Sequence, residues 1–136
     1  MTIWTADSLA KAIEGFGAFT TTVVTDTSIS VVAKDQDVPF VVAIKGNYMS
    51  VEAKLFDDSE LSNPAHIQEL LLKATDLLEL SSFTVREVDG AKVYFILGKL
   101  SASTSVENVK LEIETIAEEL SEVIAMVIKQ NEIDSK

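Results

Sequence analysis

Hydrophobic residues in the last third of the chain recur at alternating spacings of three and four, which is the period of an α-helix with one apolar stripe. The members of this apolar stripe are Val106, Val109, Ile113, Ile116, Leu120, Val123 and Val127. A helix over residues 106–128 would be roughly 35 Å long, close to the width of a domain of this size. The stripe therefore predicts a long helix that is buried against the protein's own core or, alternatively, against a second copy.

Alternating and β-branched segments in the first half of the chain predict strands. Residues 20–34 are rich in Thr and Val around Asp26-Thr27, which favours two short strands. Residues 40–44 and 48–55 flank Gly46-Asn47, and their alternation predicts a hairpin with one solvent-facing side.

The clearest turn in the chain is Asp89-Gly90, which is typical of a two-residue hairpin loop. It joins predicted strands at residues 83–88 and 91–97, and Gly98 is expected to end the second of them. Thr104 and Glu107 then predict a capping box for the long helix.

Capping residues also predict two shorter helices. The segment Thr5-Ala6-Asp7-Ser8 precedes a short apolar pattern that ends at glycine, so a capped helix of two to three turns is expected. Asn63 and Pro64 supply an N-cap and a first-turn proline for a middle helix that should end near Leu80. Its expected apolar face comprises Ile67, Leu70, Leu71, Ala74, Leu77 and Leu78.

The order of these elements lacks the alternation of strands and helices that parallel sheets require. We therefore expect an α+β fold, in which a short N-terminal helix, a middle helix and a long C-terminal helix pack on an antiparallel sheet of five to six strands. The length of 136 residues fits one domain over residues 1–136. Residues 130–136 are expected to fray as a tail.

The charge balance restricts the classes of partner. The net charge is −11, and Arg86 is the only arginine, so nucleic-acid binding is disfavoured and a basic or amphipathic protein partner fits better. Cysteine is absent, and no segment has the roughly 18 apolar residues of a membrane span, so we expect a cytoplasmic protein without disulfides.

Candidate catalytic and metal-binding residues are few. His66 is the only histidine, and the sequence places neither a serine-based arrangement nor a carboxylate beside it, so a partly exposed, neutral side chain is expected. The acidic segment at 57–60 lacks the ligand spacing of a calcium loop, and Asp35 and Asp37 are ordinary turn residues. No cofactor, metal or catalytic site is therefore predicted.

Two groups of residues are candidates for contact with another protein. Trp4, Phe16 and Phe19 bracket the first helix, and they could dock a peptide or seal that helix onto the sheet, which we favour. Leu111 falls on the face of the long helix opposite the apolar stripe, beside Glu114 and Glu118. Six glutamates against one lysine between residues 106 and 128 predict a negative outer face that could bind basic segments.

The predicted element order, small size and acidity resemble those of type III secretion chaperones. That resemblance implies a cytoplasmic homodimer that holds a secreted effector in a nonglobular state without ATP or catalysis. The opening Trp4-Thr5-Ala6-Asp7-Ser8-Leu9 and the length are similar to those of the YjfI family. Proteins of that family are bacterial and of unknown function, and their genes tend to neighbour membrane-stress genes similar to phage-shock protein A.

These observations together favour a non-enzymatic protein-binding adaptor or chaperone-like module that forms a homodimer. The alternative is a small-molecule sensor with a pocket between the sheet and the helices. A third possibility is an enzyme whose carboxylates come together only in the fold.

Overall fold

The computed structural model describes residues 2–79 and 81–136, which form a six-stranded antiparallel sheet and three α-helices. The α+β class expected from the sequence is confirmed. The elements in chain order are α1 (Ala6–Glu14), β1 (Phe19–Thr25), β2 (Ser28–Ala33), β3 (Pro39–Lys45), β4 (Tyr48–Asp57), α2 (Pro64–Ala74), β5 (Ser82–Val88), β6 (Ala91–Ser101) and α3 (Val106–Asp134). The strand order in the sheet is β1-β2-β3-β4-β6-β5.

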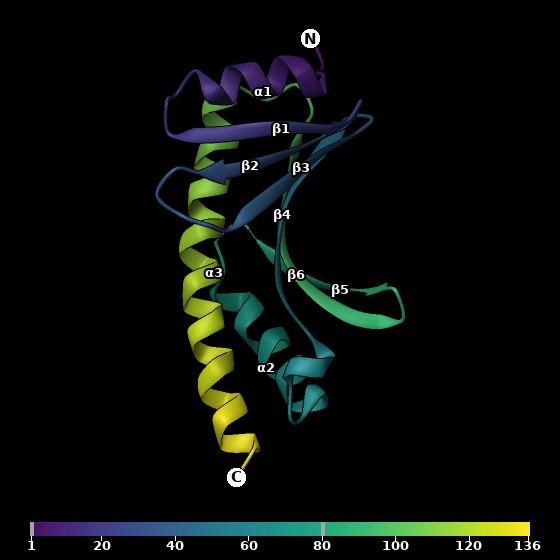
Figure 1. The fold of residues 1–136 in the computed structure, drawn as a ribbon, viewed down its shortest axis with the longest axis vertical. Coiled ribbons are helices and arrows are strands. Elements are labelled where there is room, and N and C mark those ends of the chain that lie inside the picture. Colours follow the sequence, from purple (N-terminus) through teal and green to yellow (C-terminus); the bar gives the residue numbers. More distant parts are fainter. Residues whose placement is uncertain (1, 80) are drawn as a thin grey trace.

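The helices cover one face of a strongly curved sheet (Figure 1). Helix α3 extends along the whole length of the molecule, α1 lies beside the edge strand β1, and α2 lies next to the C-terminal half of α3. The β5–β6 hairpin bends away from α3, so the opposite face of the sheet is concave in this view. We call this second face the open face.

Local sequence signals account for several element boundaries. The Thr5 side chain caps α1 by accepting from the backbone N–H of Ser8, and Asn63 caps α2 with Pro64 in its first turn. Asp89 and Gly90 have φ values of 52° and 83°, the left-handed conformation that a tight hairpin turn of this type requires.

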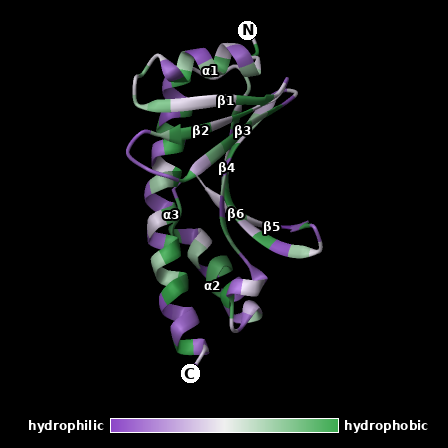
Figure 2. Cartoon of the chain, in the orientation of Figure 1, coloured by the Kyte–Doolittle hydropathy of each residue, from purple (hydrophilic) through white to green (hydrophobic). Residues whose placement is uncertain are grey.

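The core consists of two adjoining clusters. The larger one joins α1 and the N-terminal half of α3 to the strands, and it contains Ile113 and Ile116 at 2% and 0% exposure. The smaller cluster joins α2 and the C-terminal half of α3 to the sheet through Ile67, Leu71 and Val123, among others. Figure 2 shows hydrophobic and hydrophilic positions alternating along α3, as expected for a helix with one buried side.

The apolar stripe is therefore buried in the protein's own core. Val106 is half-buried against the larger cluster, and the other six members of the stripe are buried. Trp4 and Phe16 also pack against the larger cluster, and Phe19 belongs to it. The Trp4 indole N–H donates to the carbonyl of Thr104 over 2.6 Å. The interpretation of these aromatic residues as a seal is confirmed.

Two boundaries around the last hairpin differ from the sequence-based expectation. Strand β6 continues through Gly98 to Ser101, because residues 97–101 remain paired with β4 in the centre of the sheet. Ladder hydrogen bonds there outweigh the low strand propensity of a single glycine. The N-cap of α3 is Ser105 instead of Thr104, and its side chain accepts from the backbone N–H of Asn108.

The ends of α2 and α3 bear on two further expectations. Helix α2 ends at Ala74 and is followed by a 3₁₀ turn over Thr75–Leu77, while the expected end at Leu80 lies outside the described residues. Helix α3 continues to Asp134, and fraying of residues 130–136 stays a prediction. The Asn131 side chain bonds to the Ser62 N–H and the Glu60 carbonyl, at 2.8 and 3.1 Å, which ties this end of α3 to the loop before α2.

The two edges of the sheet are different. Helix α1 lies against β1, and the Glu14 carboxylate accepts from the backbone N–H and the hydroxyl of Thr21, at 3.3 and 2.8 Å. Within the described residues, no strand pairs with the outer edge of β5. An unpaired edge presents backbone donors and acceptors to another chain.

Candidate functional site

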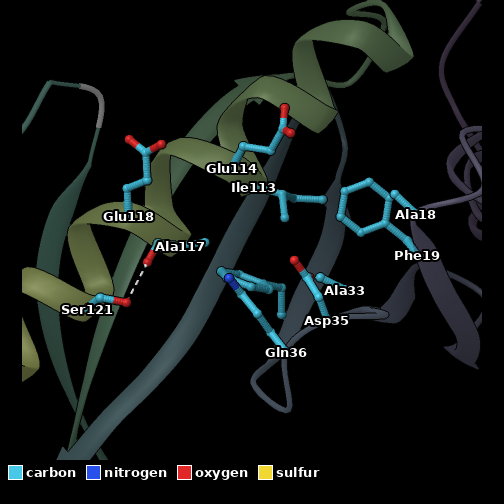
Figure 3. Close-up of a pocket in the computed structure, with 11 residues that line it drawn as sticks. Ala18, Phe19, Ala33, Asp35, Gln36, Ile113, Glu114, Ala117, Glu118 and Ser121 are labelled. Carbon is cyan, nitrogen blue, oxygen red and sulfur yellow. Dashed lines mark hydrogen bonds between the residues drawn. The ribbon is translucent and has the colours of Figure 1, made fainter.

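A groove separates α3 from the start of β1 and the loop between β2 and β3 (Figure 3). Its volume is about 350 Å³. Apolar side chains, including Phe19, Phe40 and Ile113, form its floor. In Figure 3, the Ile113 side chain extends from α3 toward the ring of Phe19. We call this feature the acidic groove because carboxylates lie along its rim.

The rim carries Glu114 and Glu118 on α3 and Asp35 on the opposite loop. The Lys110 ammonium lies 3.9 Å from the Glu114 carboxylate, and both side chains are exposed, so this ion pair contributes little. Within the described residues, neither Asp35 nor Glu118 forms an ion pair. The groove thus combines an apolar floor with a negative rim, a suitable surface for an amphipathic basic segment.

The structure separates the three residues that the sequence suggested as a partner surface. Glu114 and Glu118 line the acidic groove. Leu111 is 56% exposed on the outer side of α3 and does not line the groove.

The expectation that the six glutamates between residues 106 and 128 form an outer negative face is wrong for two of them. Glu112 and Glu119 are buried, at 2% and 8% exposure. The Glu119 carboxylate accepts from the Glu79 N–H at 3.0 Å and the Ser81 hydroxyl at 2.7 Å, so it holds the segment after α2 against α3. Burial raises the pKa of Glu112, and the charge of Glu119 raises it further. The negative outer face therefore consists of Glu107, Glu114, Glu118 and Glu122.

His66 has a carboxylate neighbour that the sequence did not indicate. Its Nδ1 atom lies 2.9 Å from Oδ1 of Asp134, a residue 68 positions later in the chain. The side chain of His66 is 46% exposed, and that of Asp134 is 7% exposed. Among the described residues, no serine hydroxyl bonds to His66. The contact between His66 and Asp134 connects the start of α2 to the end of α3.

The acidic segment after β4 forms local caps. Asp57 accepts from the backbone N–H and hydroxyl of Ser59, and the Ser59 hydroxyl lowers the pKa of this carboxyl. Glu60 accepts from the Asp57 N–H, and Asp58 accepts from the Tyr94 hydroxyl at 2.5 Å. Within the described residues, no group of three or more His, Cys, Asp or Glu side chains could hold a metal ion.

A second surface, between α2 and β5, was missed in the sequence. It surrounds a pocket of about 370 Å³ lined mainly by apolar groups, including Leu71, Leu72 and Val85. Leu72 and Leu77 are 77% and 81% exposed, although Leu77 was expected on the buried face of α2. Because α2 ends at Ala74, Leu77 lies in the 3₁₀ turn that follows and is not held on the buried face by the helical periodicity. We call this the α2–β5 surface.

The architecture, an antiparallel sheet with three helices, is shared with solved structures of other proteins. One chain of the heterodimeric ExoU–SpcU complex from the type III secretion system of Pseudomonas aeruginosa aligns with a TM-score of 0.58 and 10% identity, over 87% of this chain and 96% of that chain. YbjN from E. coli, for which a role in transcription regulation has been suggested, aligns with a TM-score of 0.62 and 13% identity, over 99% and 96% of the two chains. At these identities the likeness establishes the fold alone.

The chain belongs to the family DUF2170, an uncharacterised protein family conserved in bacteria, which it matches over residues 3–130. The protein YjfI of Escherichia coli K12, itself uncharacterised, is 27% identical over 82 residues. This match spans 60% of the present chain and 62% of YjfI. YjfI of E. coli O157:H7 matches to the same extent.

No helix within residues 2–79 and 81–136 is long and apolar enough to cross a membrane.

Proposed function

We propose that this protein is a non-enzymatic adaptor or chaperone-like module of the bacterial cytoplasm that binds a basic, amphipathic segment of another protein. The acidic groove is the observation that supports this proposal. Its floor offers apolar contact area, and Asp35, Glu114 and Glu118 surround that floor with negative charge. A helix or extended segment with apolar residues on one side and Lys or Arg on the other would match both features.

We further propose that two copies associate through the α2–β5 surface. Within the described residues, no strand pairs with the outer edge of β5, and antiparallel pairing of two β5 strands about a two-fold axis would satisfy both edges at once. Val85 lies at the middle of β5 and is 49% exposed, so the two valines would meet at the axis, near the exposed Leu72 that lines the same pocket in each copy. The test is the solution mass by light scattering, which should fall from dimer to monomer in a Leu72→Glu variant.

The groove proposal is tested by a crosslinked pull-down from the native bacterial lysate, read by mass spectrometry. The test variant is Glu114→Lys/Glu118→Lys, which reverses the charge of the groove. Glu107→Lys/Glu122→Lys is its control, because these exposed residues lie on the same helix but do not line the groove. The two variants carry equal net charge.

We expect the parent and the control to recover the same dominant partner, and the groove variant to lose at least ten-fold in recovery. High salt should weaken capture of this partner, because the contact is between charged surfaces. Equal recovery by both variants would show that the partner does not use the acidic groove. Absence of any partner of the parent protein would contradict the adaptor proposal itself.

A further inference from the structure

The open face of the sheet carries a small basic pocket, although the chain as a whole has a net charge of −11. The pocket has a volume of about 280 Å³ and lies where β3, β4, β6 and β5 run side by side. Among the described residues, three cationic ones line it, Lys45, Arg86 and Lys99, and no carboxylate does. Tyr48 and Ser50 line the pocket and alternate along β4 with the core residues Met49 and Val51, so the pocket lies on the open face, away from α3 and the acidic groove.

Strand register brings the basic residues together. Lys45 is directly opposite Tyr48 across the β3–β4 pair, and Lys99 is directly opposite Ser50 across the β4–β6 pair. Residues opposite each other have Cβ atoms about 4.5–5.5 Å apart, and positions 48 and 50 point to the same face. The Lys99 ammonium lies 5.4 Å from the centre of the Tyr48 ring, a cation–π contact that orients Lys99 beside the pocket.

The positive charge of the pocket is only partly neutralised. Arg86 forms a bidentate pair with Glu52, at 2.9 and 2.6 Å, and its guanidinium stacks 4.7 Å from the centre of the Phe95 ring. Within the described residues, neither Lys45 nor Lys99 forms an ion pair with a carboxylate. Two cations therefore remain to attract an anion.

Ser50 is the second, independent indication of a ligand. It lines the pocket and is 2% exposed, yet its hydroxyl has no hydrogen-bond partner among the described residues. Alternation along β4 predicts a solvent-facing position here, whereas the residue is buried among the strands of the open face. Buried hydroxyls in native proteins are nearly always hydrogen-bonded, and an anionic oxygen between the lysines would supply the missing acceptor.

We propose that this basic pocket binds a small anion that carries a phosphate or carboxylate group. The two ammonium groups supply charge, and the hydroxyls of Ser50, Tyr48 and Thr84 supply hydrogen-bond donors. The volume is at the low end for ligand sites, which limits the ligand to a small molecule. This inference is independent of the adaptor function, because it concerns the opposite face of the sheet.

The test is a titration of the ¹⁵N-labelled full chain, followed by backbone amide chemical shifts. Inorganic phosphate is added in one series and acetate in the other, with sodium chloride adjusted to keep the ionic strength constant. Saturable shifts confined to the neighbourhood of Ser50 and Lys99 are expected. Saturation by phosphate alone identifies a phosphate site, saturation by acetate alone a carboxylate site, and saturation by both a site selected by charge.

Variants distinguish a specific anion-binding site from general electrostatic attraction to positive charge. Lys45→Gln/Lys99→Gln should weaken binding at least ten-fold, and Ser50→Ala should weaken it at least three-fold without changing the charge. Lys54→Gln is the control, because Lys54 is an exposed lysine of β4 that does not line the pocket. The affinity of this variant for the anion should stay within two-fold of that of the parent. The proposal is overturned if neither anion saturates, if the shifts spread over the whole surface, or if Lys54→Gln weakens binding as much as the double variant.

Discussion

Replacing Ile116 with alanine should lower the free energy of unfolding by about 3 kcal/mol. Ile116 has 0% exposure and belongs to the larger core cluster, between α3 and the sheet. Alanine keeps the helical backbone and adds no polar group, so the change reports the loss of packing alone.

The magnitude follows from the atoms removed. The substitution deletes three carbon atoms, and the transfer of each from water to the core is worth about 0.8 kcal/mol, or about 2.4 kcal/mol together. The space left behind adds a further loss that depends on how far the neighbours relax, and measured Ile→Ala changes in cores lie at about 2–5 kcal/mol. Ile116→Asp should cost more, because it buries an unpaired charge.

The assay is urea unfolding, followed by circular dichroism for the helices and by fluorescence of Trp4, the only tryptophan. Both signals should shift to a lower urea midpoint with an unchanged slope, since the surface exposed on unfolding stays nearly the same. Leu111→Ala is the matched control on the same helix. Leu111 is 56% exposed, so its truncation should change stability by no more than about 0.5 kcal/mol.

Two results would refute this reasoning. A loss below about 1 kcal/mol for Ile116→Ala would mean that the residue is not enclosed as the structure has it. An equal loss for Leu111→Ala would mean that the outer face of α3 is also covered in solution, for example by a second copy.

Three further predictions concern single residues. Burial, with a smaller contribution from Glu119, raises the pKa of Glu112 above its usual 4.5, so the native state holds this proton more tightly than the unfolded chain. Protonated Glu112 therefore stabilises the fold at pH values below the pKa of the unfolded chain, and this stabilisation is lost as pH rises through the higher pKa of the folded state. Glu112→Gln should raise the urea midpoint at neutral pH. It should also make the decrease in stability from acidic to neutral pH smaller than in the parent. No gain at neutral pH would contradict a buried, unpaired carboxylate. Gly90 has a φ of 83°, so Gly90→Ala should lower stability by about 1 kcal/mol in thermal melting, and an unchanged melting temperature would exclude the left-handed turn. Asn131→Ala removes the bonds to Ser62 and Glu60 and should speed amide hydrogen exchange in the last turn of α3, whereas an unchanged rate would mean that this end already frays.

Local signals in the sequence predicted many elements of the fold. The Thr5 and Asn63 caps, the Asp89-Gly90 turn and the spacing of the apolar stripe each depend on residues within a few positions of one another. One clear error lies where distant pairing outweighed a local signal. Gly98 did not end β6, because its strand remains paired with β4 in the middle of the sheet.

The candidate sites were only partly accessible from sequence. Glu114 and Glu118 were identified from the charge of one helix face, but their apolar neighbour Phe19 reaches the acidic groove from another element. The basic pocket gave no sequence signal, because Lys45 and Lys99 are separated by more than fifty residues and meet only through the order of the strands.

By itself, the sequence determined the class of fold, the capped helices and the side of α3 that faces inward, because periodicity and capping are short-range properties. The tertiary structure decided which carboxylates are buried, with Glu112 and Glu119 under neighbouring segments and Glu114 and Glu118 in solvent. It also decided that α1 lies against β1, that within the described residues no strand pairs with the outer edge of β5, and that His66 meets Asp134. These outcomes depend on contacts between segments far apart in the chain, which no local pattern encodes.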